Sequence, residues 1–342
     1  MLLGLGTVPI GDIQKQGLLP DIYDQYLNGV GTNSWRTWNS PDGAYVQIVA
    51  KNADTLGATP MFTLYQMAAL GDSNLSGLNS QSFMQQYWDN VRLLFTQLKT
   101  YGKPALVNLE PDFWGYAQRL SNDPTKMFAY VGGSNPDCAN QPSNMVGVAS
   151  CLVQMARQYA PKAYIGFPPA TWSDLASTEM AYMKAIGADK ADFVVMQTLD
   201  RDIGCMEASY TPASCNRPWQ KIWDENNVTS PNFKEHFTYA RGYADNFKLP
   251  VIWWQTPLGQ ASTTAGGTPY AFRDNRVKYF LTRPEELVAA GGLGVVFSPG
   301  PLQTTINTDG GQYKARSSSY LASPVAQPRP RYAAFAGLAL SA

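Results

Sequence analysis

Short apolar runs and longer amphipathic segments alternate along this chain. The runs are rich in β-branched and aromatic residues, whereas the segments between them repeat their apolar positions every three to four residues. We expect strands at residues 2–8, 23–29, 59–66, 104–110, 162–167, 192–199, 249–255 and 292–298. We expect helices at residues 12–19, 41–57, 80–101, 143–160, 174–187, 231–247 and 273–290. This alternation predicts an α/β fold, a single-domain (β/α)8 TIM barrel.

A doubly wound open sheet is the main alternative fold. Such a sheet usually has fewer strands, and its first strand is often followed by a glycine fingerprint. Gly4 and Gly6 begin that pattern, but its third glycine is missing. We therefore expect residues 1–342 to form one barrel, with residues 317–342 as a C-terminal strap that also supplies a short closing helix.

The composition favours a neutral partner. Lys and Arg together number 26, as do Asp and Glu, so no net field attracts nucleic acid or an anionic membrane. No apolar run approaches the roughly 20 residues that a membrane span needs. Aromatic residues make up 12% of the chain, and flat rings with a polar tip suit the faces of sugars. We expect a monomer whose partner is a carbohydrate substrate, with neither nucleic acid nor membrane.

The four cysteines fall as two local pairs within long Pro/Asn/Ser-rich stretches. Proximity favours pairing Cys138 with Cys151 and Cys205 with Cys215, although four cysteines allow three connectivities. Disulfides persist in oxidising compartments, so we expect a secreted, extracellular protein. A zinc site is the alternative, but no CxxC occurs, and the only histidine, His236, is expected to pack within a helix. We expect no metal and no cofactor.

The segment Ala105-Leu-Val-Asn-Leu-Glu-Pro-Asp-Phe-Trp-Gly-Tyr116 carries the candidate chemistry. In a strand, side chains two apart share a face, so Asn108, Glu110 and Asp112 are expected to line one wall of a cleft. Apolar neighbours would desolvate Glu110 and raise its pKa toward the working pH of a general acid. The alternative is that Glu110 pairs with an arginine or caps the next helix.

Other candidates lie where the expected strands end, because the carboxyl ends of barrel strands meet at one mouth. Asp200 is the preferred second carboxylate, with Asp112 next and Asp202 or Asp12 behind them. Only one of the adjacent Trp253 and Trp254 can face the site, because neighbours on a strand point oppositely. The expected sugar-binding residues are rings, amides and one acid: Trp35, Trp38, Tyr65, Gln66, Asn108, Trp114, Trp172, Gln197, Asp202, Trp253, Trp254 and Gln255.

This pattern resembles the (β/α)8-barrel glycoside hydrolase superfamily over about residues 1–300. In its large retaining clan, the resemblance implies an acid/base glutamate ending strand four, which is Glu110 here, and a nucleophile glutamate ending strand seven. Leu109 replaces the asparagine that usually precedes the first, and Gln255 occupies the second position. Substrate assistance, as in chitinase-like hydrolases, is a minor alternative, because residues 196–200 match their motif only loosely. An inverting mechanism fits the missing carboxylate better.

The sequence therefore predicts a secreted glycoside hydrolase that cleaves O-glycosidic bonds of a neutral or weakly charged polysaccharide. Glu110 is expected to act as general acid, with Asp200 or Asp112 as the second carboxylate. Two alternatives stay open. One is a catalytically silent carbohydrate-binding barrel, since Gln255 replaces a nucleophile. The other is a metal-assisted hydrolase with Glu110, Asp112 and Asp200 around a divalent ion.

Overall fold

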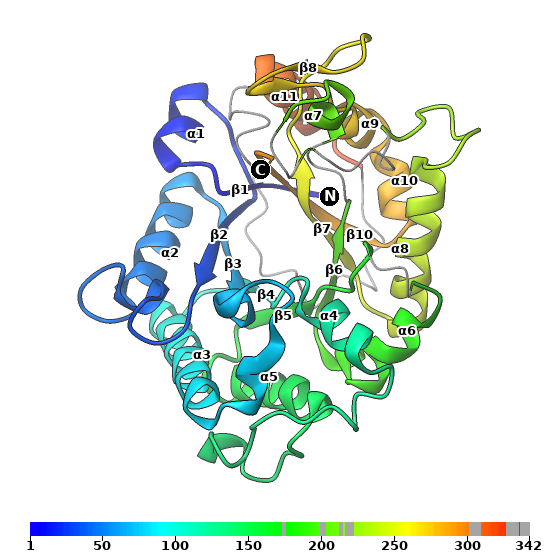
Figure 1. The fold of residues 1–342 in the computed structure, drawn as a ribbon. Helices are drawn as coiled ribbons and strands as arrows, with labels where there is room; N and C mark the ends of the chain where they lie inside the picture. Colours follow the sequence, from blue (N-terminus) through cyan, green and yellow to red (C-terminus); the bar gives the residue numbers. More distant parts are fainter. Residues whose placement is uncertain are drawn as a thin grey trace. The chain divides into compact units, whose positions relative to one another are not determined.

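The computed structural model describes residues 1–172, 176–198, 203–211, 215, 222–300, 309–325 and 335. Within these ranges, eight strands close a barrel in the order β1-β10-β7-β6-β5-β4-β3-β2 (Figure 1). The pairs β1–β10, β10–β7, β3–β4, β4–β5 and β5–β6 are parallel. The predicted fold class, a (β/α)8 barrel, is confirmed.

The strands lie within a few residues of their expected positions. The barrel strands are β1 (Leu2–Gly6), β2 (Ile22–Asn28), β3 (Thr59–Tyr65), β4 (Ala105–Leu109), β5 (Ala163–Phe167), β6 (Phe193–Gln197), β7 (Val251–Pro257) and β10 (Gly292–Ser298). Two short strands, β8 (Gly267–Thr268) and β9 (Ala271–Phe272), pair antiparallel. The α-helices are α1 (Ile10–Gln16), α2 (Ala44–Leu56), α3 (Gln81–Tyr101), α4 (Phe113–Leu120), α5 (Met145–Tyr159), α6 (Ala176–Ala185), α7 (Ile203–Glu207), α8 (Phe233–Phe247), α9 (Arg276–Thr282), α10 (Pro284–Ala289) and α11 (Gln312–Ala322).

Two helical segments differ from expectation. The single helix predicted over residues 273–290 is divided into α9 and α10, because Pro284 cannot continue a helix from the preceding turn. The segment expected to form a strap from residue 317 begins inside α11, which ends at Ala322. The proposed closing helix near the C-terminus lies outside the described residues, apart from Phe335.

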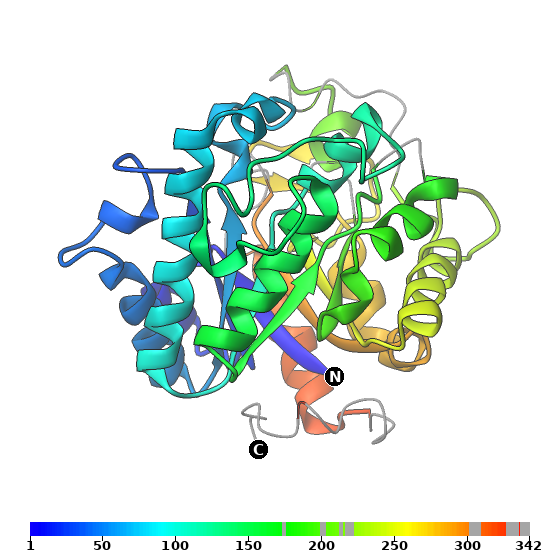
Figure 2. The same cartoon turned by 90° about the horizontal axis from the view of Figure 1, so that it is seen from below.

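The chain divides into two compact units, which are described separately: Met1–Tyr23 with Met196–Ala342, and Asp24–Val195. In the second, α3 packs against both α2 and α5 (Figures 1 and 2). Ser80 caps the start of α3 by accepting the N–H of Phe83, and the helix ends at Gly102, whose φ of 71° suits glycine. The apolar residues of α3, among them Met84, Val91, Leu94 and Leu98, are buried.

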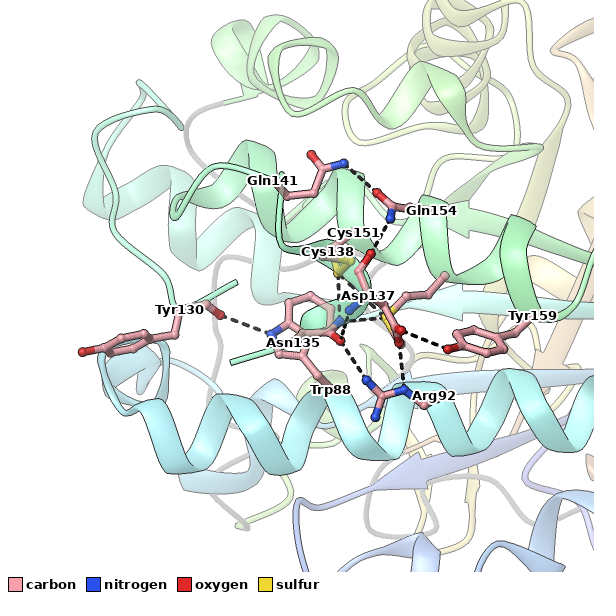
Figure 3. Close-up of a disulfide and its surroundings, with 11 residues drawn as sticks. Trp88, Arg92, Tyr130, Asn135, Asp137, Cys138, Gln141, Cys151, Gln154 and Tyr159 are labelled. Atoms are coloured by element: carbon pink, nitrogen blue, oxygen red, sulfur yellow. Dashed lines mark hydrogen bonds and ion pairs between the residues drawn. A yellow bond between two sulfur atoms is a disulfide. The ribbon is translucent and has the colours of Figure 1, made fainter. Parts of the chain in front are cut away.

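Both expected disulfides, Cys138–Cys151 and Cys205–Cys215, are present. The first lies beside a polar network between α3 and α5 (Figure 3). Arg92 on α3 binds Asp137 at 2.7 Å and Asn135 at 2.9 Å, while the amide of Asn135 reaches the sulfur of Cys151 at 3.3 Å. The disulfide and the arginine therefore fix the long segment after α4 to the two helices.

In the other unit, His236 on α8 is buried among aromatic rings. Its Nε2 accepts the indole N–H of Trp253 at 2.9 Å, and Trp223 and Phe237 also contact its ring. Burial, together with the positive charge of Arg276, lowers the pKa of His236 to about 3. The histidine is thus a neutral packing residue, as the sequence indicated. Among the described helices, none is long and apolar enough to span a bilayer.

Replacing His236 with glutamine is expected to reduce the acid sensitivity of the fold. Between pH 6.5 and 3 the unfolded chain binds a proton at this histidine that the folded chain does not, so stability falls as pH falls. Between pH 7 and pH 4, the free energy of unfolding of the wild type should therefore fall by about 3 kcal/mol more than that of His236→Gln. Urea unfolding at both pH values measures this difference, and equal losses would contradict it.

Candidate active site

Glu110 follows β4 but turns away from the face that the strand pattern assigns to it. Its φ is 58°, and its N–H donates to the carbonyl of Leu64 at 2.8 Å. One carboxyl oxygen, Oε2, accepts the backbone N–H groups of Gln66 and Met67, both at 2.9 Å. These groups begin the 3-10 turn η2 (Met67–Leu70). Glu110 therefore caps a turn after β3, on the side where Tyr87 of α3 lies next to it.

The expectation that Asn108, Glu110 and Asp112 share one wall is wrong. Left-handed backbone at Glu110 and at Asp112, whose φ is 66°, interrupts the two-residue period of the strand. Asn108 is buried and donates to Thr63 at 3.4 Å, and Thr63 in turn donates to the buried Asp24 at 2.9 Å. The three side chains therefore have three separate environments.

The protonation of Glu110 follows expectation, but its accessibility does not. Burial raises the pKa of the Glu110 carboxyl to about 8, against the lowering effect of the N–H groups of Met67 and Gln66 and of the Tyr87 hydroxyl. The group is thus protonated at neutral pH, yet its side chain has no exposed surface. A general acid must reach the leaving oxygen of its substrate. Glu110 is therefore protonated but enclosed, and its assignment as that acid stays a prediction.

Trp35 and Gln66, which the sequence assigned to sugar binding, also lie inside the protein. Both are fully buried next to Glu110. The side-chain oxygen of Gln66 accepts the indole N–H of Trp35 at 3.1 Å and the amide of Asn90 at 2.8 Å. Buried polar groups need such internal partners. Here the indole N–H of Trp35 is paired with Oε1 of Gln66, whereas Nε2 of Gln66 has no hydrogen-bond partner among the described residues.

Asp112 is only partly buried, and three aromatic or acidic groups gather around it. Its Oδ1 accepts the indole N–H of Trp172 at 2.7 Å, and its Oδ2 accepts the hydroxyl of Tyr65 at 3.3 Å. The same hydroxyl lies 3.0 Å from Oδ1 of the exposed Asp72. We call Tyr65, Asp72, Asp112 and Trp172 the Asp112 cluster.

Further rings and a cation border the Asp112 cluster. Tyr26 meets the Tyr65 ring edge-on at 6.0 Å, and the Tyr116 ring lies 4.7 Å from that of Trp172. The guanidinium of Arg119 lies 4.7 Å from the centre of the Trp172 ring. These bordering residues come from β2 and from α4.

Local sequence features place the cluster. Tyr65 is the last residue of β3, Asp112 follows β4, and Trp172 follows β5, so all three lie at the carboxyl ends of neighbouring strands. A side chain on Gly115 of α4 would collide with Ala170 and crowd Trp172. Glycine at this position therefore lets the segment after β5 approach α4 closely, which brings the Trp172 indole to Asp112.

The electrostatics of the cluster keep Tyr65 neutral. Burial and the charges of Asp112 and Asp72 raise the pKa of the Tyr65 hydroxyl far above its ordinary value. Burial and the same two carboxylates also raise the pKa of Tyr116, although Arg119 opposes this. Tyr65 is thus a permanent hydroxyl donor and acceptor between two carboxylates.

The remaining candidates lie elsewhere. Trp114 is fully buried and donates to the carbonyl of Leu109 at 2.9 Å. Trp253 and Trp254 are both buried, so neither of them is exposed to ligand. Trp38 is 48% exposed and packs edge-on against Tyr45.

The two glutamine candidates belong to the unit that contains residues 196–342. Gln197 is buried, and Gln255 is partly exposed, with a φ of 53°. Asp200 and Asp202 lie outside the described residues.

Sequence reasoning missed Asp72, Tyr26 and Tyr116. Asp72 lies beyond the 3-10 turn that follows β3, and Tyr26 lies within β2. The rule that strand ends converge would have found Asp72 if the search had extended a full turn past β3, and Tyr26 if it had included the last residues within β2. Among the described residues, no three His, Cys, Asp or Glu side chains gather as a metal site requires. The metal-assisted alternative depends on Asp200 and stays a prediction.

No family model and no curated protein matches the chain. Among solved structures, it is similar to a trimodular GH5_4 subfamily endoglucanase, at 11% identity and a TM-score of 0.51, over 92% of this chain and 60% of that one. It is also similar to the β-1,4-mannanase of the common sea hare Aplysia kurodai, at 12% identity and a TM-score of 0.49, over 96% and 94% of the two chains. A further similar structure is the cellulose synthase subunit Z of Clostridioides difficile, at 11% identity and a TM-score of 0.49, over 92% and 99%. At such identities, the likeness to the endoglucanase shows the fold alone.

Proposed function

We propose that this chain is a secreted glycoside hydrolase that cleaves O-glycosidic bonds of a neutral or weakly charged polysaccharide. The supporting observation is that Asp112, a partly exposed carboxylate at the strand ends, is held by the Trp172 indole and the Tyr65 hydroxyl. Tyrosine and tryptophan rings surround it, as sugar recognition favours. The two disulfides agree with an oxidising, extracellular location.

In this proposal Asp112 replaces Glu110 as the general acid. Asp112 gives its proton to the leaving oxygen as the glycosidic bond breaks, and water attacks the anomeric carbon. A second carboxylate takes the proton of that water. Asp200 stays our candidate for this role, although it lies outside the described residues. Two fixed donors on Asp112 hold its carboxyl in one orientation, which is what proton transfer to a bound substrate requires.

Reducing-sugar release from a panel of mannan, β-glucan and xylan tests this function. We expect the wild type to release reducing ends from at least one of them. Retention by a polysaccharide in an affinity gel without release would instead favour the silent carbohydrate-binding barrel. Neither release nor retention over the whole panel would contradict both readings.

Replacing Trp172 with phenylalanine is expected to weaken hydrolysis without abolishing it. The change keeps an aromatic ring but removes the N–H that binds Asp112 at 2.7 Å. A hydrogen bond to a neutral carboxyl group contributes about 0.5–1.5 kcal/mol, so kcat/KM should fall roughly twofold to tenfold. Steady-state kinetics on the cleaved polysaccharide measure this fall, and an unchanged kcat/KM would contradict it.

A further inference from the structure

Glu110 binds the backbone on both sides of Tyr65. The ladder of parallel pairs between β3 and β4 ends at Leu64, which pairs with the residue before Glu110. Beyond this pair, the N–H of Glu110 donates to the carbonyl of Leu64 at 2.8 Å. Oε2 of Glu110 accepts the N–H groups of Gln66 and Met67, both at 2.9 Å. Glu110 therefore continues the pairing of the two strands past the end of the ladder, and Tyr65 lies inside the segment that it holds.

Asp112 contacts the other end of Tyr65. Its Oδ2 lies 3.3 Å from the Tyr65 hydroxyl. Glu110 and Asp112 both have positive φ, 58° and 66°, so one side chain turns to the backbone after β3 and the other to the phenol. Left-handed backbone is costly for residues other than glycine, and such strain is typical of functional sites. The segment Glu110-Pro-Asp112 therefore holds Tyr65 both at its backbone and at its hydroxyl.

The contact between Tyr65 and Asp112 is sensitive to small shifts of the backbone. At 3.3 Å it is longer than most O–H···O bonds, which measure about 2.5–3.0 Å. A tyrosine side chain has only two torsion angles, so a displacement of its backbone moves the hydroxyl with it. The Tyr26 ring meets the Tyr65 ring edge-on at 6.0 Å, which limits a compensating rotation. The position of the hydroxyl thus depends on what holds the backbone of residues 64–67.

We propose that Glu110 is a positioning residue, which places the Tyr65 hydroxyl against Asp112 by capping the turn η2 after β3. Its role in turnover rests on the proposed hydrolysis, because Asp112 is the acid whose carboxyl Tyr65 orients. For this role Glu110 needs only an acceptor oxygen of the right reach, since it receives two N–H groups and transfers no proton. A general acid at residue 110 would need a transferable proton. The two roles therefore make opposite predictions for variants of Glu110.

Two variants of Glu110 separate the reach of the side chain from its proton. Glu110→Gln keeps the length of the side chain and an oxygen for the N–H groups of Gln66 and Met67, but it has no acid. Glu110→Asp keeps the acid but is one methylene shorter, so its carboxyl cannot reach those N–H groups unless the backbone moves. Aspartate tolerates left-handed backbone better than most residues, so it suits the φ of 58° at this position.

Carbon-13 NMR of protein labelled at the tyrosine Cζ tests the positioning without any substrate. Tyr65→Phe assigns the Tyr65 signal. We expect this signal to keep its wild-type position in Glu110→Gln and to move in Glu110→Asp, because the hydroxyl leaves Asp112. Ser80→Ala is the matched control, since it also removes an acceptor of a backbone N–H in the same unit, that of Phe83, and should leave the signal in place. Movement in Glu110→Gln, or an unmoved signal in folded Glu110→Asp, would overturn the proposal.

The order of activities gives a second readout. If polysaccharide is cleaved, kcat of Glu110→Gln should stay within about threefold of the wild type. That of Glu110→Asp should fall about tenfold to a hundredfold, since a misplacement of about 1 Å can cost 10²-fold, whereas KM should change little in both variants. The reverse order, with Glu110→Asp the more active, would make Glu110 the acid and overturn the proposal. The expected Tyr65 signals in a protein that cleaves no polysaccharide would keep the placement of Tyr65 by Glu110 and reject the proposed hydrolysis.

Discussion

Asp112→Asn is expected to lower kcat/KM by about 10²-fold to 10⁴-fold, which is the contribution of a positioned general acid. The amide oxygen can still accept the indole N–H of Trp172, so the local structure is retained. What the variant lacks is a proton to give to the leaving oxygen. The measurement is kcat/KM for reducing-sugar release, made alongside a thermal melt that checks the fold.

The matched control for this variant is Asp54→Asn. Asp54 belongs to the same unit and bonds a tyrosine as Asp112 does, but its carboxylate pairs with the exposed Lys103 and lies on α2. An exposed ion pair of this kind contributes little, so activity should stay within about twofold of the wild type. If Asp112→Asn kept most of the wild-type activity, Asp112 would not be the acid.

Glu110→Gln is expected to remove a large loss of stability at alkaline pH. The folded chain keeps the Glu110 proton up to a pKa of about 8, whereas the unfolded chain releases it near 4.5, so stability falls as pH rises through this window. Glutamine stays neutral, and its oxygen can accept the N–H groups of Gln66 and Met67 as Glu110 does. Between pH 5 and pH 9, the free energy of unfolding of the wild type should therefore fall by on the order of 4 kcal/mol more than that of Glu110→Gln.

Urea unfolding at pH 5, 7 and 9 measures this change, and taking the difference between the proteins removes the contribution of other titrating groups. Glu110→Leu is the informative companion, because it leaves two buried N–H groups without an acceptor. Each such group costs about 1–3 kcal/mol, so the leucine variant should be less stable at every pH. Parallel curves for wild type and Glu110→Gln would mean that Glu110 is ionised in the folded protein.

The barrel could be predicted because its signals are local. A buried strand needs a short apolar run, and an amphipathic helix needs its own period, so both are visible in one stretch of sequence. Even the break between α9 and α10 has a local signal in Pro284. Sequence reasoning treated that stretch as one helix, although proline disfavours a helical conformation at the residue before it.

The orientation of Glu110 had no such signal. It precedes Pro111, and a residue before proline is biased toward extended backbone, so a φ of 58° opposes the local preference. The energy that stabilises this conformation comes from the two N–H groups after β3, which are distant in sequence. The two-residue alternation of side chains along a strand cannot predict a contact between residues that are so distant in sequence.

The site itself was predicted in part. Tyr65, Asp112 and Trp172 were each expected at strand ends, and the structure brings them together. Trp35, Trp114, Trp253 and Trp254 were assigned to sugar on the same reasoning but are buried. An indole suits both a core and a ligand surface, and the sequence contains nothing that separates the two.

The central claim is that the partly exposed Asp112, and not the enclosed Glu110, carries out the acid chemistry. The most direct measurement is the kcat/KM of Glu110→Gln on a cleaved polysaccharide at neutral pH, compared with the wild type. Because Glu110 is already neutral and buried there, the account predicts a value within about threefold. A loss of about 10²-fold or more in a fully folded variant would place Glu110 in the reaction and contradict the account.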